Sequence, residues 1–110
     1  MAKVKKSSKT IKVKGKKLHS IIQHAMGCMF LSEIEPLIFV FKESRKLNIH
    51  TCFVRYPLDI AFLDEKKTII EVKKNVKPWC CFNSKTCPHF MIETKAGRFD
   101  FKLNDKVTFL

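Results

Sequence analysis

This 110-residue sequence has no long hydrophobic run and only 10 acidic residues against 22 Lys and Arg. No segment approaches the roughly 20 apolar residues that a membrane-spanning helix needs. The N-terminus carries lysines without an apolar segment behind them, which is not the pattern of a secretory signal. These absences predict a soluble cytoplasmic protein with no membrane partner.

The sequence also lacks the Gly-x-Ser-x-Gly element, the phosphate-binding loop and the dinucleotide fingerprint. Enzymes that depend on these motifs are therefore not indicated. Its five cysteines are an odd number, and cytosolic thiols are kept reduced, so no structural disulfide is predicted. No cofactor is predicted either.

A chain of this size folds as one domain with one modest core. The hydrophobic fraction of 45% and the ten Phe residues are typical of a folded protein.

The net charge of +12 is unevenly distributed. Residues 1–17 contain eight Lys and no acid, while the remaining 14 Lys and Arg against 10 acidic residues leave only +4. Charge repulsion predicts a disordered basic arm at residues 1–9, followed by a single β domain at residues 10–110.

Short apolar or alternating segments separated by polar turns predict about eight strands and almost no helix. The predicted strands are Thr10–Lys14, His19–Met26, Pro36–Phe41, Leu47–Val54, Leu58–Leu63, Thr68–Val72, Phe90–Thr94 and Val107–Leu110. We expect one helical turn or a loop in Gly27–Glu35, a charged loop in Lys73–Pro78 and irregular chain in Cys80–Pro88. The pattern favours a mainly-β fold, a sandwich or barrel, with at most one or two short helical turns.

Residues 50–64 form the centre of the sequence, because two apolar segments flank a Tyr-Pro corner at residues 56–57. At a period of two, Leu58, Ile60 and Phe62 point to one side, and Asp59 points to the other side. A carboxylate in such a strand needs a hydrogen-bond donor, a cation or solvent.

The Pro-Leu-Asp-Ile-x-Phe-x-Asp pattern of Pro57–Asp64 resembles the signature of the family known as domain of unknown function 192. Gly27–Phe30 resembles its Gly-Leu-Met-Phe element, and Leu37–Phe41 resembles its Leu-Phe-x-Phe strand. Phe90–Gly97 resembles its Tyr-Val-Leu-Glu-x-Pro-Ala-Gly element. The resemblance covers roughly residues 20–110 and implies a mainly-β sandwich with jelly-roll character.

Three positions depart from that pattern: Cys28 replaces Leu, Cys52 replaces an aromatic residue and Lys95 replaces Pro. The residues before the Pro-Leu-Asp resemble the shorter, archaeal-type form of the family. The family has no established activity, so the resemblance implies a fold and little chemistry.

A tight hairpin with Arg55 and Tyr56 in its loop would place Cys52 opposite Asp59 and His50 diagonal to it. The functional interpretation is a polar pocket in which these residues and Arg55 bind a small polar ligand, or a His–Asp pair that moves protons. The alternative is structural, with Asp59 accepting hydrogen bonds from backbone N–H groups of the corner. A Cys–His–Asp trio also suggests acyl transfer, but relatives carry an aromatic residue at the position of Cys52, so catalysis is not favoured.

Three further groups of residues are candidate functional sites. Cys80, Cys81, Cys87 and His89 could bind zinc, although their spacing is not one of the usual zinc patterns. Trp79, the single Trp, either closes the core, which is favoured, or contacts a ligand. The lysines of the arm could bind nucleic acid weakly and without sequence preference, or only keep the protein soluble. These lysines are Lys3, Lys5, Lys6, Lys9, Lys12, Lys14, Lys16 and Lys17.

The sequence therefore predicts a small non-catalytic binding module with candidate ligand contacts at His50, Arg55, Asp59 and Trp79. A nucleic-acid accessory that uses the Lys arm is the first alternative, and a zinc-stabilised domain is the second.

Overall fold

The computed structural model describes residues 10–18, 36–41, 46–50 and 56–110, with only the backbone for Lys16, Leu18 and His50. The predicted strand at His19–Met26 and the predicted turn or loop at Gly27–Glu35 lie outside the described residues. Within the described ranges the chain forms nine strands and no helix, and so no helix long and apolar enough to cross a membrane. The mainly-β prediction is confirmed.

A five-stranded sheet forms the middle of the molecule, in the order β2-β3-β8-β5-β6. Strand β2 pairs with β3 in parallel, and the other neighbours are antiparallel. The strands are β2 (Lys16–Leu18), β3 (Leu37–Val40), β8 (Phe90–Lys95), β5 (Leu58–Leu63) and β6 (Ile69–Val76).

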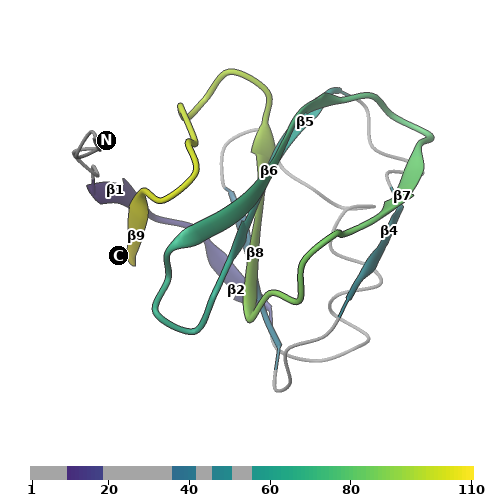
Figure 1. Cartoon of the computed structure of the whole chain (residues 1–110). Coiled ribbons are helices and arrows are strands. Elements are labelled where there is room, and N and C mark those ends of the chain that lie inside the picture. Colours follow the sequence, from purple (N-terminus) through teal and green to yellow (C-terminus); the bar gives the residue numbers. More distant parts are fainter. Residues whose placement is uncertain (1–9, 19–35, 42–45, 51–55) are drawn as a thin grey trace, which may run out of the picture.

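Two small sheets complete the fold: β1 (Thr10–Val13) pairs in parallel with β9 (Lys106–Phe109), and β4 (Asn48–His50) pairs antiparallel with β7 (Cys81–Asn83). Figure 1 shows the two pairs at opposite ends of the view, with the five-stranded sheet between them. The fold is therefore a sandwich of three layers.

The two faces of β5 lie in separate hydrophobic clusters. Leu58, Ile60 and Phe62 pack with residues of the β4–β7 side, whereas Ala61 and Leu63 pack with residues of the β1–β9 side. The alternation predicted for this strand is confirmed. All six residues of β5 are buried, since the strand has sheet neighbours on both edges and a layer on both faces.

Residues 51–55 lie outside the described residues, but the hypothesis of a tight hairpin that pairs the segment before Tyr56 with β5 is excluded by the partners of β5. Strand β5 pairs with β6 and β8, which occupy both of its edges, and β4 pairs with β7 in a different sheet. Residue 59 faces Thr94 of β8 in the register. The local pattern of two apolar segments around a corner did not reveal that the segments belong to different layers.

Two other boundaries differ from the prediction. Lys73–Val76 continue β6 and are not a loop, and Cys81–Asn83 form β7 within a segment predicted to be irregular. Strand β6 is an edge strand, so its lysines reach solvent and make the segment look like a loop.

Candidate functional site

Asp59 joins the end of strand β6 to the 96–97 turn at one end of the five-stranded sheet. The backbone N–H of Asn75 donates to Oδ1 of Asp59 at 2.8 Å, and that of Gly97 donates to Oδ2 at 2.9 Å. The residue is only 5% exposed. Asp59 therefore has the contacts of the structural alternative, in which backbone amides compensate a buried carboxylate.

Both donors have left-handed backbones, with φ of 54° at Asn75 and 87° at Gly97. The register of β5 against β6 shifts between Leu58 and Ile60, because one extra residue of β6 lies between their partners. This irregularity is a β-bulge that includes Asn75, and Asn and Gly are the residues that adopt such backbones most readily. The carboxylate of Asp59 thus fixes the bulge and the 96–97 turn together.

The Tyr-Pro corner is attached to the same turn. The N–H of Ala96 donates to the carbonyl of Pro57 at 3.0 Å, and the Lys95 ammonium lies 5.5 Å from the ring centroid of Tyr56. In the register, Leu58 faces Val76 on one side and Lys95 on the other. The corner, the end of β6 and the end of β8 therefore leave the sheet side by side.

Thr94 is a buried polar residue of this site that sequence reasoning did not select. It faces Asp59 across the β5–β8 pair, is 1% exposed, and its hydroxyl forms no hydrogen bond with any described residue. A Thr in a strand is an ordinary β-former, so nothing in the sequence marks this position as special.

Trp79 does not close the core, and that prediction is wrong. Its side chain is 66% exposed in the turn between β6 and β7, and its φ is 64°. A bulky residue at a positive φ is an outlier that natural proteins retain mainly at special sites. The turn follows the bulge at Asn75, which changes the direction of the chain and presents Trp79 to solvent.

The other predicted ligand contacts are not assembled around Asp59. Arg55 lies outside the described residues. The backbone of His50 pairs with Cys81 in the β4–β7 sheet, on the face of the large sheet opposite to the Asp59 side chain. The shared face predicted for His50 and Asp59 depended on the hairpin that does not form.

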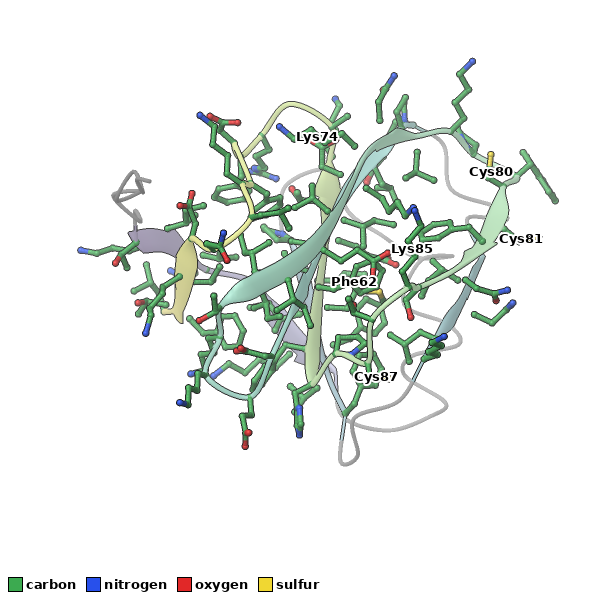
Figure 2. The ribbon with its side chains drawn as sticks, in the orientation of Figure 1. Phe62, Lys74, Cys80, Cys81, Lys85 and Cys87 are labelled. Atoms are coloured by element: carbon green, nitrogen blue, oxygen red, sulfur yellow. The ribbon has the colours of Figure 1, made fainter. Side chains whose placement is uncertain are left out.

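The candidate zinc ligands are not gathered either. Cys80, Cys81 and Cys87 are exposed, and Figure 2 shows Cys87 well apart from Cys80 and Cys81. Among the residues that the structure describes, no three His, Cys, Asp or Glu side chains could hold one metal ion. The zinc-stabilised alternative is not favoured.

Glu71 is a second buried carboxylate that sequence reasoning missed. Its Oε1 accepts the N–H of Thr86 at 3.0 Å and the Thr86 hydroxyl at 2.7 Å, and both carboxylate oxygens accept the N–H of Lys85. Burial alone would raise the pKa of Glu71, but these hydrogen bonds and the charge of Lys73 outweigh it and lower the pKa below 4.5. Glu71 thereby fixes the 84–86 loop to the face of the sheet that packs against β4 and β7.

The lysines of the arm are placed only from Lys12 onward. Lys12, Lys14 and Lys17 are exposed, and Lys16 pairs through its backbone with Leu37. The first four of the predicted nucleic-acid contacts lie outside the described residues.

The layered strands and the carboxylates that hold their loops define a small β-sandwich domain. Residues 2–109 match the family described as "Uncharacterized ACR", domain of unknown function 192, and the chain belongs to this family. The resemblance seen in the sequence is confirmed.

The relatives are archaeal UPF0127 proteins. The chain is 31% identical over 94 residues to one from Pyrococcus abyssi, which covers 82% of this chain and 80% of the relative. It is 30% identical over 67 residues to one from Thermococcus sibiricus, and the match covers 59% of this chain and 43% of that relative. The crystal structure of a protein of unknown function from Novosphingobium aromaticivorans matches with a TM-score of 0.74 at 21% identity, covering 84% of this chain and 71% of that one. This likeness shows the fold.

Proposed function

We propose that this protein is a non-catalytic binding module whose ligand contacts lie where β5, β6 and β8 end around Asp59. The observation that carries the proposal is the exposure of Trp79 on a left-handed backbone, three residues after β6 ends at Val76. An exposed Trp supplies a large, rigid contact area, and Trp is enriched where proteins bind partners.

In this proposal Asp59 positions the surface and does not itself contact the ligand. Its two oxygens accept backbone amides from the end of β6 and from the 96–97 turn, so the loops on either side of the corner are held in one arrangement. Preorganised loops lower the entropy cost of binding. Lys95 and Tyr56 supply a cation and a second aromatic ring at the same end.

The test is a set of ¹H–¹⁵N NMR spectra of the full chain with mixtures of small polar compounds, including nucleotides, sugars and amino acids. We expect at least one compound to shift the indole N–H of Trp79 together with the amides of Tyr56 and Lys95. Because Trp79 has a positive φ, Trp79→Gly removes the ring while suiting the backbone. That variant should keep its melting temperature and lose the shifts. Shifts confined to other strands, or none at all, would refute the proposed site.

A second candidate function is weak binding of nucleic acid through the Lys arm. It is favoured by the exposure of Lys12, Lys14 and Lys17, the described part of an arm that contains no acid. Ammonium groups that neutralise phosphates release counterions, so such binding is strongly salt-dependent. Deletion of residues 1–9 should abolish retention of single-stranded RNA at low salt, and retention that survives the deletion would contradict this candidate.

A further inference from the structure

Thr94 carries a hydroxyl group into the interior of the domain. It lies in β8, faces Asp59 of β5 in the antiparallel register and is 1% exposed. Its Oγ1 makes no hydrogen bond with any described residue. A hydroxyl that leaves water and stays unsatisfied loses its hydration without compensation, and native proteins rarely keep such a group. A partner for this hydroxyl is therefore expected beside Asp59.

The sheet around Thr94 is apolar apart from Asp59. Alternate residues of a strand share a face, so Ile92 lies next to Thr94 on β8, and Ala61 lies next to Asp59 on β5. Ile92 and Ala61 are fully buried members of the hydrophobic cluster on the β1–β9 side. On this face of β5 and β8, both of which the structure describes in full, Thr94 and Asp59 are the two polar side chains.

The carboxylate of Asp59 keeps acceptor capacity after it has bound its two backbone donors. Oδ1 accepts the N–H of Asn75, and Oδ2 accepts the N–H of Gly97. A carboxylate has about four lone-pair sites, so about two of them remain, and a Thr hydroxyl can donate one hydrogen bond. A molecule that accepts from Thr94 and donates to Asp59 would satisfy both side chains.

The spacing of the two residues suits a single water molecule. Facing residues of an antiparallel pair have Cβ atoms about 4.5–5.5 Å apart, and their side chains stand roughly perpendicular to the sheet. Two O–H···O hydrogen bonds of about 2.7–2.8 Å that meet at one water molecule span about 4.5 Å. A larger ligand is not favoured, because Thr94 is 1% exposed and Asp59 is 5% exposed.

Gly97 connects this pair to solvent. Gly97 is exposed, and no atom lies within 4 Å of the place where a Cβ would stand on it. Its N–H donates to Oδ2 of Asp59 at 2.9 Å, so the open side of Gly97 lies one hydrogen bond away from the carboxylate. Internal waters that bridge buried polar groups are common in globular proteins, on the order of one per 27 residues.

We propose that one internal water molecule is bound between Thr94 and Asp59, where it accepts a hydrogen bond from the Thr94 hydroxyl and donates one to the Asp59 carboxylate. The water joins Thr94 to the group that holds the β6 bulge and the 96–97 turn. This inference does not depend on the ligand proposed above, since it concerns the interior of the domain.

The first test is the sign of the stability change in Thr94→Val, which replaces the hydroxyl by a methyl group of similar shape. If water bridges the pair, the variant loses a water-mediated hydrogen bond, and its melting temperature should fall by about 4–8 °C. If the hydroxyl has no partner, the variant removes a desolvation cost, and its melting temperature should rise. Thr108→Val, at an exposed position of β9, is the matched control and should melt within about 2 °C of wild type.

The second test observes the water by NMR spectroscopy of the full chain. In wild type, the methyl group of Thr94 should show a nuclear Overhauser cross-peak to water with the sign of a long-lived bound molecule. The methyl groups of Thr94→Val should show none. Because the water also binds Asp59, the amide signals of Asn75 and Gly97 should shift in Thr94→Val and stay in place in Thr108→Val.

Four results would overturn the inference. One is a melting temperature of Thr94→Val at or above that of Thr108→Val. Another is a wild-type spectrum without the water cross-peak. A lower melting temperature without that cross-peak would mean that Thr94 bonds directly to Asp59. A water cross-peak in wild type, with the amides of Asn75 and Gly97 unchanged in Thr94→Val, would show that the water does not reach Asp59.

Discussion

Four acidic side chains are buried in the described part of the domain: Asp59, Glu71, Glu93 and Asp105. A buried carboxylate is costly unless hydrogen bonds compensate it. Asp59 obtains those bonds from N–H groups of the β6 bulge and the 96–97 turn, and Glu71 obtains them from N–H groups of the 84–86 loop. The carboxylates of Asp59 and Glu71 therefore connect their own strands to neighbouring parts of the chain. With acids inside, the exposed surface is dominated by lysine.

Asp59→Asn should destabilise the fold, because an amide keeps one acceptor and turns an N–H₂ group toward a backbone donor. Leaving a buried donor unsatisfied costs about 1–3 kcal/mol, so we expect a loss of about 2 kcal/mol in the free energy of unfolding. Urea denaturation followed by circular dichroism measures this loss. Asp100→Asn is the matched control, since that carboxylate lies on the surface beside Lys74 and Lys102. Equal midpoints for the two variants would show that Asp59 does not hold the loops.

Glu71 should make stability depend on pH in the acid range. Its pKa is lowered in the folded protein from an ordinary value of 4.5, so the ionised form favours folding. The contribution is complete above about pH 4.5 and is lost as the pH falls through the lower pKa of the folded state. The difference in unfolding free energy between wild type and Glu71→Gln should therefore be largest near neutral pH and shrink below about pH 4.5. A difference that does not change with pH would contradict the assigned hydrogen bonds.

At the scale of single elements, the parallel pairing of β2 with β3 depends on a close approach at Gly15. A Cβ at this position would overlap the carbonyl oxygen of Pro36. The pairing of Lys16 with Leu37 begins at the next residue of each strand, so neither backbone can move aside without disturbing the ladder. Only Gly allows the two chains this close.

Gly15→Ala should therefore cost about 2 kcal/mol of stability, within the range of about 1–3 kcal/mol for overpacked sites. Thermal denaturation of the full chain measures the effect. Lys14→Ala, at the exposed neighbouring position, serves as the control and should melt close to wild type. If Gly15→Ala melts like Lys14→Ala, the close approach is not a constraint on the fold.

At the scale of the whole molecule, strand β1 belongs to the folded domain. Val13 of β1 is fully buried in the cluster that also contains Val107 of β9 and Phe101, so β1 is part of the sandwich. We propose that the domain boundary falls at residue 10, where the pairing of β1 with β9 begins. The basic residues before it would contribute charge and not stability.

Two truncations test that boundary. Deletion of residues 1–9 should leave the melting temperature within about 2 °C of wild type. Deletion of residues 1–13 removes β1, uncovers apolar surface of the second cluster and should lower the free energy of unfolding by about 2 kcal/mol or more. Equal melting temperatures for the two truncated proteins would place the boundary after β1.

The sequence alone determined the fold class, the family and most strand positions, including the two faces of β5. Alternation with a period of two is a local property, and it can be read wherever a strand has differently packed faces. The alternation was less informative for β6, which runs along a sheet edge, because a segment with exposed lysines has the composition of a loop.

Only the tertiary structure decided the site. Asp59 binds amides that are 16 and 38 residues away along the chain. Which layer receives β4, and hence whether His50 meets Asp59, is set by the pairing of distant strands. Such partners are chosen by the packing of the whole chain, and no local pattern of residue types encodes them.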